Sequence, residues 1–135
     1  KKEKYRFIIY IRICFKNYIM NILIDIDGTV SDDIPNEESY RFATAKVLNN
    51  AVESVNNLYD SGHNITFFTA RLEKDRDVTQ KWLLDNGFKF HSLLMNKPRG
   101  GNYIWIDNLD VTGVKYRNNW KELETILQNW KQLQN

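Results

Sequence analysis

The chain has 135 residues, of which 42% are hydrophobic, 27% charged and 13% aromatic. This length suits one domain, and so many aromatic residues argue against a disordered chain. A net charge of +2 is too small to favour a nucleic-acid partner, and the single Cys14 excludes an internal disulfide or a cysteine-based zinc site. We therefore expect a reducing, cytoplasmic setting.

Residues 1–19 form a basic arm that differs from the rest of the chain. They hold six basic residues and one acidic residue, for a charge of +5, which leaves −3 for residues 20–135. The apolar run at 7–15 contains Arg12 and falls short of the ~20 apolar residues that span a membrane. Arg12 and the missing small-residue cleavage site also argue against a secretory signal. Two interpretations stay open: the arm precedes a natural start at Met20, or it is an added strand or membrane-surface segment.

The first half of the domain at 20–135 predicts alternating strands and helices. The apolar run at 21–27 is typical of a buried parallel strand, and it ends in an Asp-Gly-Thr turn. After a polar loop at 31–36, apolar residues at helical spacing predict a helix from Glu37 to about Tyr59. A second strand follows at 65–69. A second helix is expected at 75–86, with Gly87 as its stop.

The second half of the domain continues the same pattern. We predict strands at 88–95 and 103–107, a short edge strand at 111–116, and a last helix with an apolar stripe that starts at Trp120. Asn119 and Glu122 stand at capping-box spacing before this helix. Strands that alternate with helices indicate an α/β fold with a mainly parallel sheet.

Reactive side chains follow four of the predicted strands. Asp25 and Asp27 end the first strand, Thr69 ends the second, Lys97 follows the third, and Asp107 ends the fourth. The carboxyl ends of parallel strands meet at one edge, where active sites of open α/β sheets lie. Carboxylates there suit Mg²⁺, and one of them can attack phosphorus to form an aspartyl-phosphate. A threonine hydroxyl and a lysine can stabilise the transferring phosphoryl group.

These motifs resemble the haloacid dehalogenase (HAD) superfamily of aspartate-nucleophile phosphatases. All four motifs of that superfamily occur in its order within about residues 20–110: Asp25-Ile-Asp-Gly-Thr29 after an apolar strand, Thr69-Ala-Arg71, Asn96-Lys97-Pro98, and Asp107-Asn108 after an apolar strand. The first motif is highly specific, and the others are persuasive only together.

The resemblance implies a three-layer α/β/α Rossmann-like fold and a Mg²⁺-dependent phosphomonoester hydrolase. Asp25 would be the nucleophile, and Asp27 would protonate the leaving group and then activate water. Mg²⁺ would be held by Asp25, the backbone carbonyl of Asp27, and Asp107. The phosphate and substrate would be bound by the backbone near Ile26 and Asp27, and by Thr69, Ala70, Arg71 and Lys97, with Arg71 as a substrate-side cation.

Two features refine this expectation. Many relatives carry a second acid where this chain has Asn108, which places the metal affinity in question. The segments between the motifs are filled by the predicted helices and strands and leave no room for a sizeable cap domain. We therefore expect an open site, a large substrate, or a lid from a second subunit in a homo-oligomer. The stretch at 61–71 resembles small capless bacterial phosphatases of capsule or lipopolysaccharide sugar phosphates, which implies a small-molecule sugar phosphate as substrate.

Two other classes of function remain open. A phosphoaspartate receiver domain of a signalling protein also combines acids, a threonine and a lysine, but its phosphorylated Asp follows a middle strand. A catalytically degenerate HAD-like binding module is the second alternative, and Asn108 motivates it. Neither a nucleic-acid partner nor a membrane span is expected.

Overall fold

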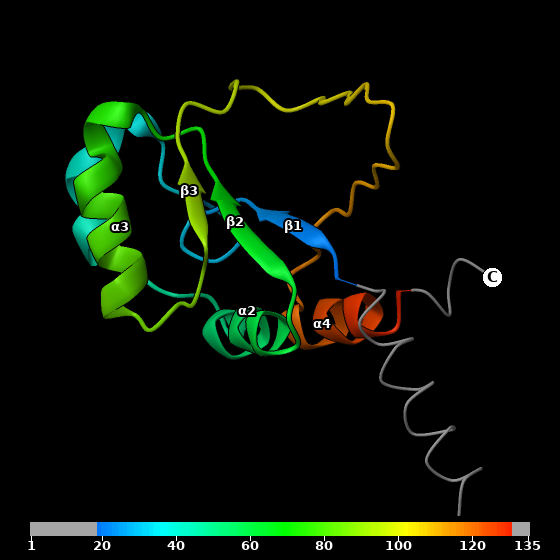
Figure 1. Ribbon diagram of the computed structural model, residues 1–135. Helices are drawn as coiled ribbons and strands as arrows, with labels where there is room; N and C mark the ends of the chain where they lie inside the picture. Colours follow the sequence, from blue (N-terminus) through cyan, green and yellow to red (C-terminus); the bar gives the residue numbers. More distant parts are fainter. Residues whose placement is uncertain (1–18, 131–135) are drawn as a thin grey trace, which may run out of the picture.

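The computed structural model describes residues 19–130 (Figure 1). Three parallel strands form its sheet in the order β1-β2-β3: β1 (Asn21–Ile24), β2 (Asn64–Phe68) and β3 (Ser92–Leu94). These strands lie within the runs predicted at 21–27, 65–69 and 88–95, apart from Asn64 at the start of β2. The predicted α/β fold with a parallel sheet is confirmed, whereas the predictions for the arm concern residues almost entirely outside the described range.

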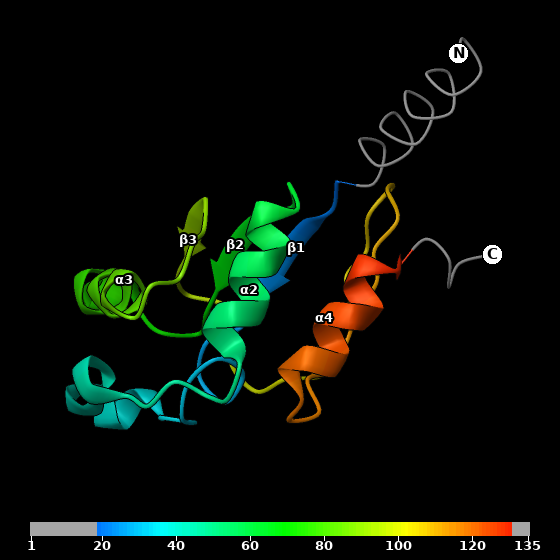
Figure 2. The same ribbon diagram turned by 90° about the horizontal axis from the view of Figure 1, so that it is seen from below.

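Helices connect and cover the strands. The chain between β1 and β2 forms a 3-10 helix η1 (Asn36–Thr44) and the helix α2 (Ala51–Asp60), and β2 leads to η2 (Glu73–Asp75) and α3 (Arg76–Asp85). The last helix is α4 (Trp120–Gln128), whose predicted cap is confirmed: Asn119 Oδ1 accepts a hydrogen bond from the Glu122 amide. α2 and α4 lie side by side, and α3 packs against η1 (Figures 1 and 2). These connections contain no large cap domain.

The core lies between the sheet and these helices. Its buried members are mainly aliphatic and aromatic, and they come from every strand and from α2, α3 and α4: Ile24, Ile26, Val30, Ala51, Val55, Leu58, Ile65, Phe67, Trp82, Leu83, Phe88, Leu93, Met95 and Trp120. Two indole groups also fix loops to helices. Trp82 Nε1 donates to the Ala45 carbonyl at 2.9 Å, and Trp120 Nε1 donates to the Thr29 carbonyl at 2.7 Å. α4 is thereby attached to the turn that follows β1.

The single helix predicted from Glu37 to about Tyr59 is wrong, because the chain is extended between η1 and α2. Val47 forms an antiparallel bridge with Ser31, and the Leu48 amide donates to the Val30 carbonyl at 3.0 Å. Asn50 then takes a left-handed φ of 63° directly before α2. The apolar spacing continues through this segment, but its backbone groups bond to residues 30–32, since the Asp32 amide also donates to the Lys46 carbonyl at 3.0 Å.

The strands predicted at 103–107 and 111–116 are not formed. All residues from 101 to 115 are exposed, including the apolar ones, and they run as an extended loop between β3 and α4 (Figure 1). None of these residues pairs with a strand of the sheet within the described chain. Within the same described range, no helix has the length and apolarity that a membrane crossing requires.

Candidate active site

The turn after β1 presents Asp25 at the carboxyl end of that strand. The amides of Thr29, Val30 and Ser31 all donate to the Ile26 carbonyl, at 3.0, 2.9 and 3.3 Å, which folds the chain back on itself. Gly28 has a φ of 81°, a left-handed conformation that glycine adopts without steric strain. The Asp-Gly-Thr sequence therefore forms a tight turn that faces Asp25 toward the residues following it.

Asp25 is held by two donors and stays accessible. Its Oδ1 accepts a hydrogen bond from Lys97 Nζ at 2.8 Å, and its Oδ2 accepts one from Thr29 Oγ1 at 2.9 Å. The Asp25 side chain is 37% exposed, whereas Lys97 is only 14% exposed. A carboxylate with about four lone-pair positions keeps acceptor capacity beyond these two bonds. Asp25 is thus both oriented and open to an incoming ligand.

Lys97 reaches Asp25 because the chain after β3 runs beside the chain after β2. The Lys97 amide donates to the Thr69 carbonyl at 2.9 Å, and the Asn96 amide donates to the Arg71 carbonyl at 2.8 Å. Asn96 takes a φ of 63° at this point. Thr69 itself is fully buried, and its Oγ1 accepts a hydrogen bond from the Arg71 amide at 3.1 Å. The threonine and lysine motifs are therefore joined through the backbone.

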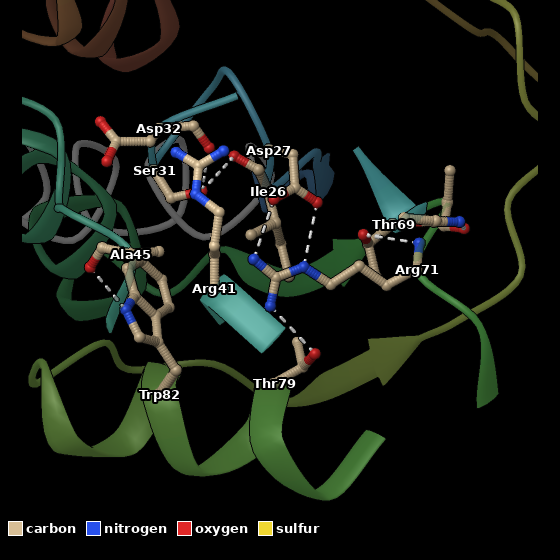
Figure 3. A network of polar contacts seen from close by, with 12 residues as sticks. Ile26, Asp27, Ser31, Asp32, Arg41, Ala45, Thr69, Arg71, Thr79 and Trp82 are labelled. Atoms are coloured by element: carbon tan, nitrogen blue, oxygen red, sulfur yellow. Dashed lines mark hydrogen bonds and ion pairs between the residues drawn. The ribbon is translucent and has the colours of Figure 1, made fainter. Parts of the chain in front are cut away.

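Asp27 faces Arg71 (Figure 3). Arg71 Nε donates to Asp27 Oδ2 and Arg71 Nη2 donates to Asp27 Oδ1, both at 2.9 Å. The Arg71 side chain is fully buried and that of Asp27 is 15% exposed. Burial raises the pKa of Asp27 above its ordinary value, while the hydrogen bonds and charge of Arg71 oppose this rise, and the negative charges of Asp25 and Asp33 add to it. Asp27 thus follows Asp25 by two residues, with both of its carboxylate oxygens bonded to Arg71.

The structure brings most of the predicted site residues together, but Thr69 and Arg71 have no exposed surface and Asp107 lies apart. Arg71 is buried against Asp27, so in this arrangement its guanidinium does not face a substrate, contrary to the sequence-based expectation. Asp107 lies in the exposed loop, where its carboxylate accepts hydrogen bonds from Trp105 Nε1 and the Leu109 amide. These bonds lower the pKa of Asp107. Ile26 is buried and Ala70 is half-buried. Both have apolar side chains, so only their backbone groups could bind a phosphate.

Two contacts of the site were not predicted from the sequence. Phe42 of η1 lies 3.8 Å from Arg71 Cζ, measured to the ring centroid, and Thr79 of α3 accepts a hydrogen bond from Arg71 Nη1 at 3.1 Å. Thr79 stands three and four positions before Trp82 and Leu83, and so on the apolar face of the predicted helix, which was an available signal. Phe42 had no signal of its own, because its place depends on the break in the helix predicted at 37–59.

Residues 22–104 match the family model described as the PITM 1-3, LNS2 domain. This match covers more than half of the chain. The chain belongs to this LNS2 domain family. The family has a HAD-like, phosphatase-type fold, which confirms the HAD resemblance at the level of the fold and supports a phosphatase in general terms. No curated protein matches this LNS2 domain.

Solved structures support the same fold for the LNS2 domain. A chain of the Pnkp1/Rnl/Hen1 complex is similar with a TM-score of 0.53 and 20% identity, over 62% of this chain and 31% of that one. A protein from Vibrio cholerae gives a TM-score of 0.53 and 16% identity, over 83% of this chain and 99% of that one. A structure of the Pnkp1/Rnl/Hen1 RNA repair complex gives 0.52 and 18%, over 83% and 32%. The LNS2 domain thus spans about a third of the chains it matches in these complexes.

Proposed function

We propose that this LNS2 domain is a phosphomonoester hydrolase in which Asp25 is the nucleophile. The observation that carries the proposal is the Asp25 carboxylate, accessible at the end of β1 and held between Lys97 Nζ at 2.8 Å and Thr29 Oγ1 at 2.9 Å. A positioned carboxylate beside a lysine matches the needs of covalent phosphoryl transfer, where the cation offsets negative charge on the phosphoryl group. We propose a sugar phosphate as the substrate class.

The reaction would proceed in two displacements at phosphorus. An Asp25 carboxylate oxygen forms a bond to phosphorus while the bond to the ester oxygen breaks, and the leaving oxygen takes a proton from Asp27. Water then attacks the phosphorus of the aspartyl-phosphate and gives a proton to Asp27, and the bond to Asp25 breaks to release inorganic phosphate. Burial raises the pKa of Asp27, which is the direction that a proton donor needs, whereas the ion pair with Arg71 favours the charged form.

Mg²⁺ is implied by the resemblance, but the side chains as arranged here do not fit it. Within residues 19–130, no group of three or more His, Cys, Asp or Glu side chains is placed to hold a metal ion. Asp25 keeps acceptor positions beyond its bonds to Lys97 and Thr29, but Asp107 bonds within its own loop, so the two carboxylates are not placed to share an ion. The steps above therefore use no metal. The resemblance predicts that chelation by EDTA abolishes phosphate release and that added Mg²⁺ restores it, whereas the arrangement described here predicts unchanged release after chelation.

The nucleophile is tested by Asp25→Asn. We expect phosphate release from a panel of sugar phosphates, nucleotides and phosphoproteins to fall by at least about a thousandfold, because an amide cannot form the acyl phosphate. Asp85→Asn is the matched control, since Asp85 is an exposed carboxylate on α3 that pairs with Lys81. Wild-type turnover retained by Asp25→Asn would disprove the assignment. Absence of turnover in the wild-type protein across the panel would favour the binding module, and stable phosphorylation by acetyl phosphate would favour a receiver domain.

A further inference from the structure

Arg71 is the most completely enclosed charged group of the described chain. Its side chain has no exposed surface, and each of its three guanidinium nitrogens donates a hydrogen bond. Nε and Nη2 donate to Asp27, and Nη1 donates to Thr79 Oγ1 at 3.1 Å. The ring of Phe42 covers the guanidinium plane at 3.8 Å from Cζ. Figure 3 shows the guanidinium between Asp27 and Thr79. A side chain held from three sides has one geometry available to it.

The bond to Asp27 is the contact with chemical consequence. Two parallel N–H···O bonds from one guanidinium fix both the position and the plane of a carboxylate, which a single-point cation such as lysine cannot do. Thr79 and Phe42 in turn fix the guanidinium, and they come from α3 and η1, two elements that pack together. The orientation of Asp27 is therefore set by helices that lie outside the turn after β1.

We propose that Arg71 is a positioning residue, which acts on the reaction through Asp27 and makes no contact with substrate. This inference rests on the proposed function, because it concerns the residue that transfers protons in that reaction. A carboxyl group must lie within hydrogen-bond reach of the leaving oxygen to protonate it, so loss of the two-point contact reduces proton transfer more than binding. The loss of rate on changing Arg71 should therefore be larger for a leaving group that must be protonated than for one that is stable as an anion.

The experiment compares two substrates in Arg71→Lys. An alkyl phosphate such as glycerol phosphate needs a proton on its leaving oxygen, whereas 4-nitrophenyl phosphate releases a stable phenolate. We expect kcat/KM, which reports the steps up to the aspartyl-phosphate, to fall by about tenfold or more for glycerol phosphate and to stay within about threefold for 4-nitrophenyl phosphate. The later attack of water, in which Asp27 takes a proton, is common to both substrates and does not enter kcat/KM. In an Asp27→Asn background, Arg71→Lys should add less than about a twofold loss, because the two residues act as one unit.

Two other variants keep the result interpretable. Arg76→Lys is the matched control: Arg76 makes a similar two-point pair with Glu73 and also donates to the Leu93 carbonyl at 3.0 Å, but it does not bond to Asp27, so both kcat/KM values should stay at the wild-type level. Thr79→Val removes the hydroxyl that fixes Nη1 while it keeps the side-chain shape, and it should shift the two kcat/KM values in the same sense as Arg71→Lys. If Arg71→Lys does not fold, Thr79→Val alone decides the question.

The outcomes separate this inference from the proposed function. Equal losses of kcat/KM on both substrates would make Arg71 a substrate-binding cation if KM carries the loss, or a merely structural residue if kcat carries it; either result overturns the inference. ¹⁵N NMR of the arginine Nε–H groups gives a readout without turnover. We expect a slowly exchanging Arg71 signal that Asp27→Asn alters and Glu73→Gln does not. Absence of turnover in the wild-type protein would contradict the proposed function. A fast-exchanging Arg71 signal would overturn the inference about Arg71, whether or not turnover is found.

Discussion

Two segments of this LNS2 domain have similar sequences, but one forms a paired strand and the other an exposed loop. Asn21–Ile24 and the following Asp25 form β1 and its reactive end, and residues 103–107 repeat the same pattern of apolar residues followed by an aspartate. Ile24 is buried at 4% exposure, whereas Ile104 and Ile106 are 89% and 92% exposed. β1 is paired with β2 along its length, while 103–107 has no strand partner within the described residues. Local sequence sets the potential for a strand, and pairing decides whether it forms.

The same difference separates the two aspartates that end these segments. Asp25 lies in a network with long-range members, since Lys97 is 72 positions away along the chain. Asp107 is bonded to Trp105 and Leu109, each two positions away. Contacts between distant segments fix a carboxylate relative to the sheet, whereas contacts within one loop move with the loop. We therefore expect chemistry at Asp25 and little at Asp107 in this arrangement.

After the loss of Asp25 itself, the largest effect on turnover should come from removing its long-range partner. Lys97→Met keeps much of the side-chain bulk but removes the ammonium group at 2.8 Å from Asp25 Oδ1. Loss of one charge-stabilising donor from a phosphoryl-transfer site should lower kcat by about a hundredfold or more. Steady-state phosphate release measures this, with the exposed Lys89→Met as control. A Lys97→Met protein within threefold of wild type would show that Lys97 only balances charge in the resting state.

A smaller effect is expected on stability from the indole groups of the two regions. Trp120→Phe removes the hydrogen bond to the Thr29 carbonyl and should cost about 1–3 kcal/mol of the free energy of unfolding, because Trp120 is buried. Trp105→Phe changes an exposed residue of the loop, and its effect should stay within about 0.5 kcal/mol. Urea unfolding monitored by circular dichroism compares the two. Equal losses would show that the loop is packed as firmly as the turn after β1.

The sequence predicts well those parts of the fold that are set by nearby residues. The strands β1, β2 and β3, the Asp-Gly-Thr turn and the Asn119 cap all follow from patterns within about ten residues. The errors occur where distant segments decide. The helix expected at 37–59 is broken because Val47 pairs with Ser31, and that pairing leaves no mark on the apolar spacing.

The contacts of the candidate site also differ in how far the sequence predicts them. The meeting of Asp25 with Lys97 was predictable, because both follow parallel strands that end at one edge of the sheet. The pairing of Arg71 with Asp27 was not, since an arginine after a strand is equally able to face solvent. Its burial depends on Phe42 and Thr79, whose positions come from tertiary packing.

The smallest expected effect is at Asp107, and it tests the comparison most directly. In the arrangement described here, Asp107→Asn should change kcat by no more than about twofold, because the carboxylate bonds only within its loop. Asp110→Asn, in the same loop, is the control. The HAD resemblance predicts the opposite, a loss of about a hundredfold or more that excess Mg²⁺ partly reverses, as expected for a metal ligand. That second result would mean that residues 103–107 reach the site during turnover. They would then pair with the edge of β1 that is free in the described chain, because a parallel strand there would bring Asp107 to the same end of the sheet as Asp25.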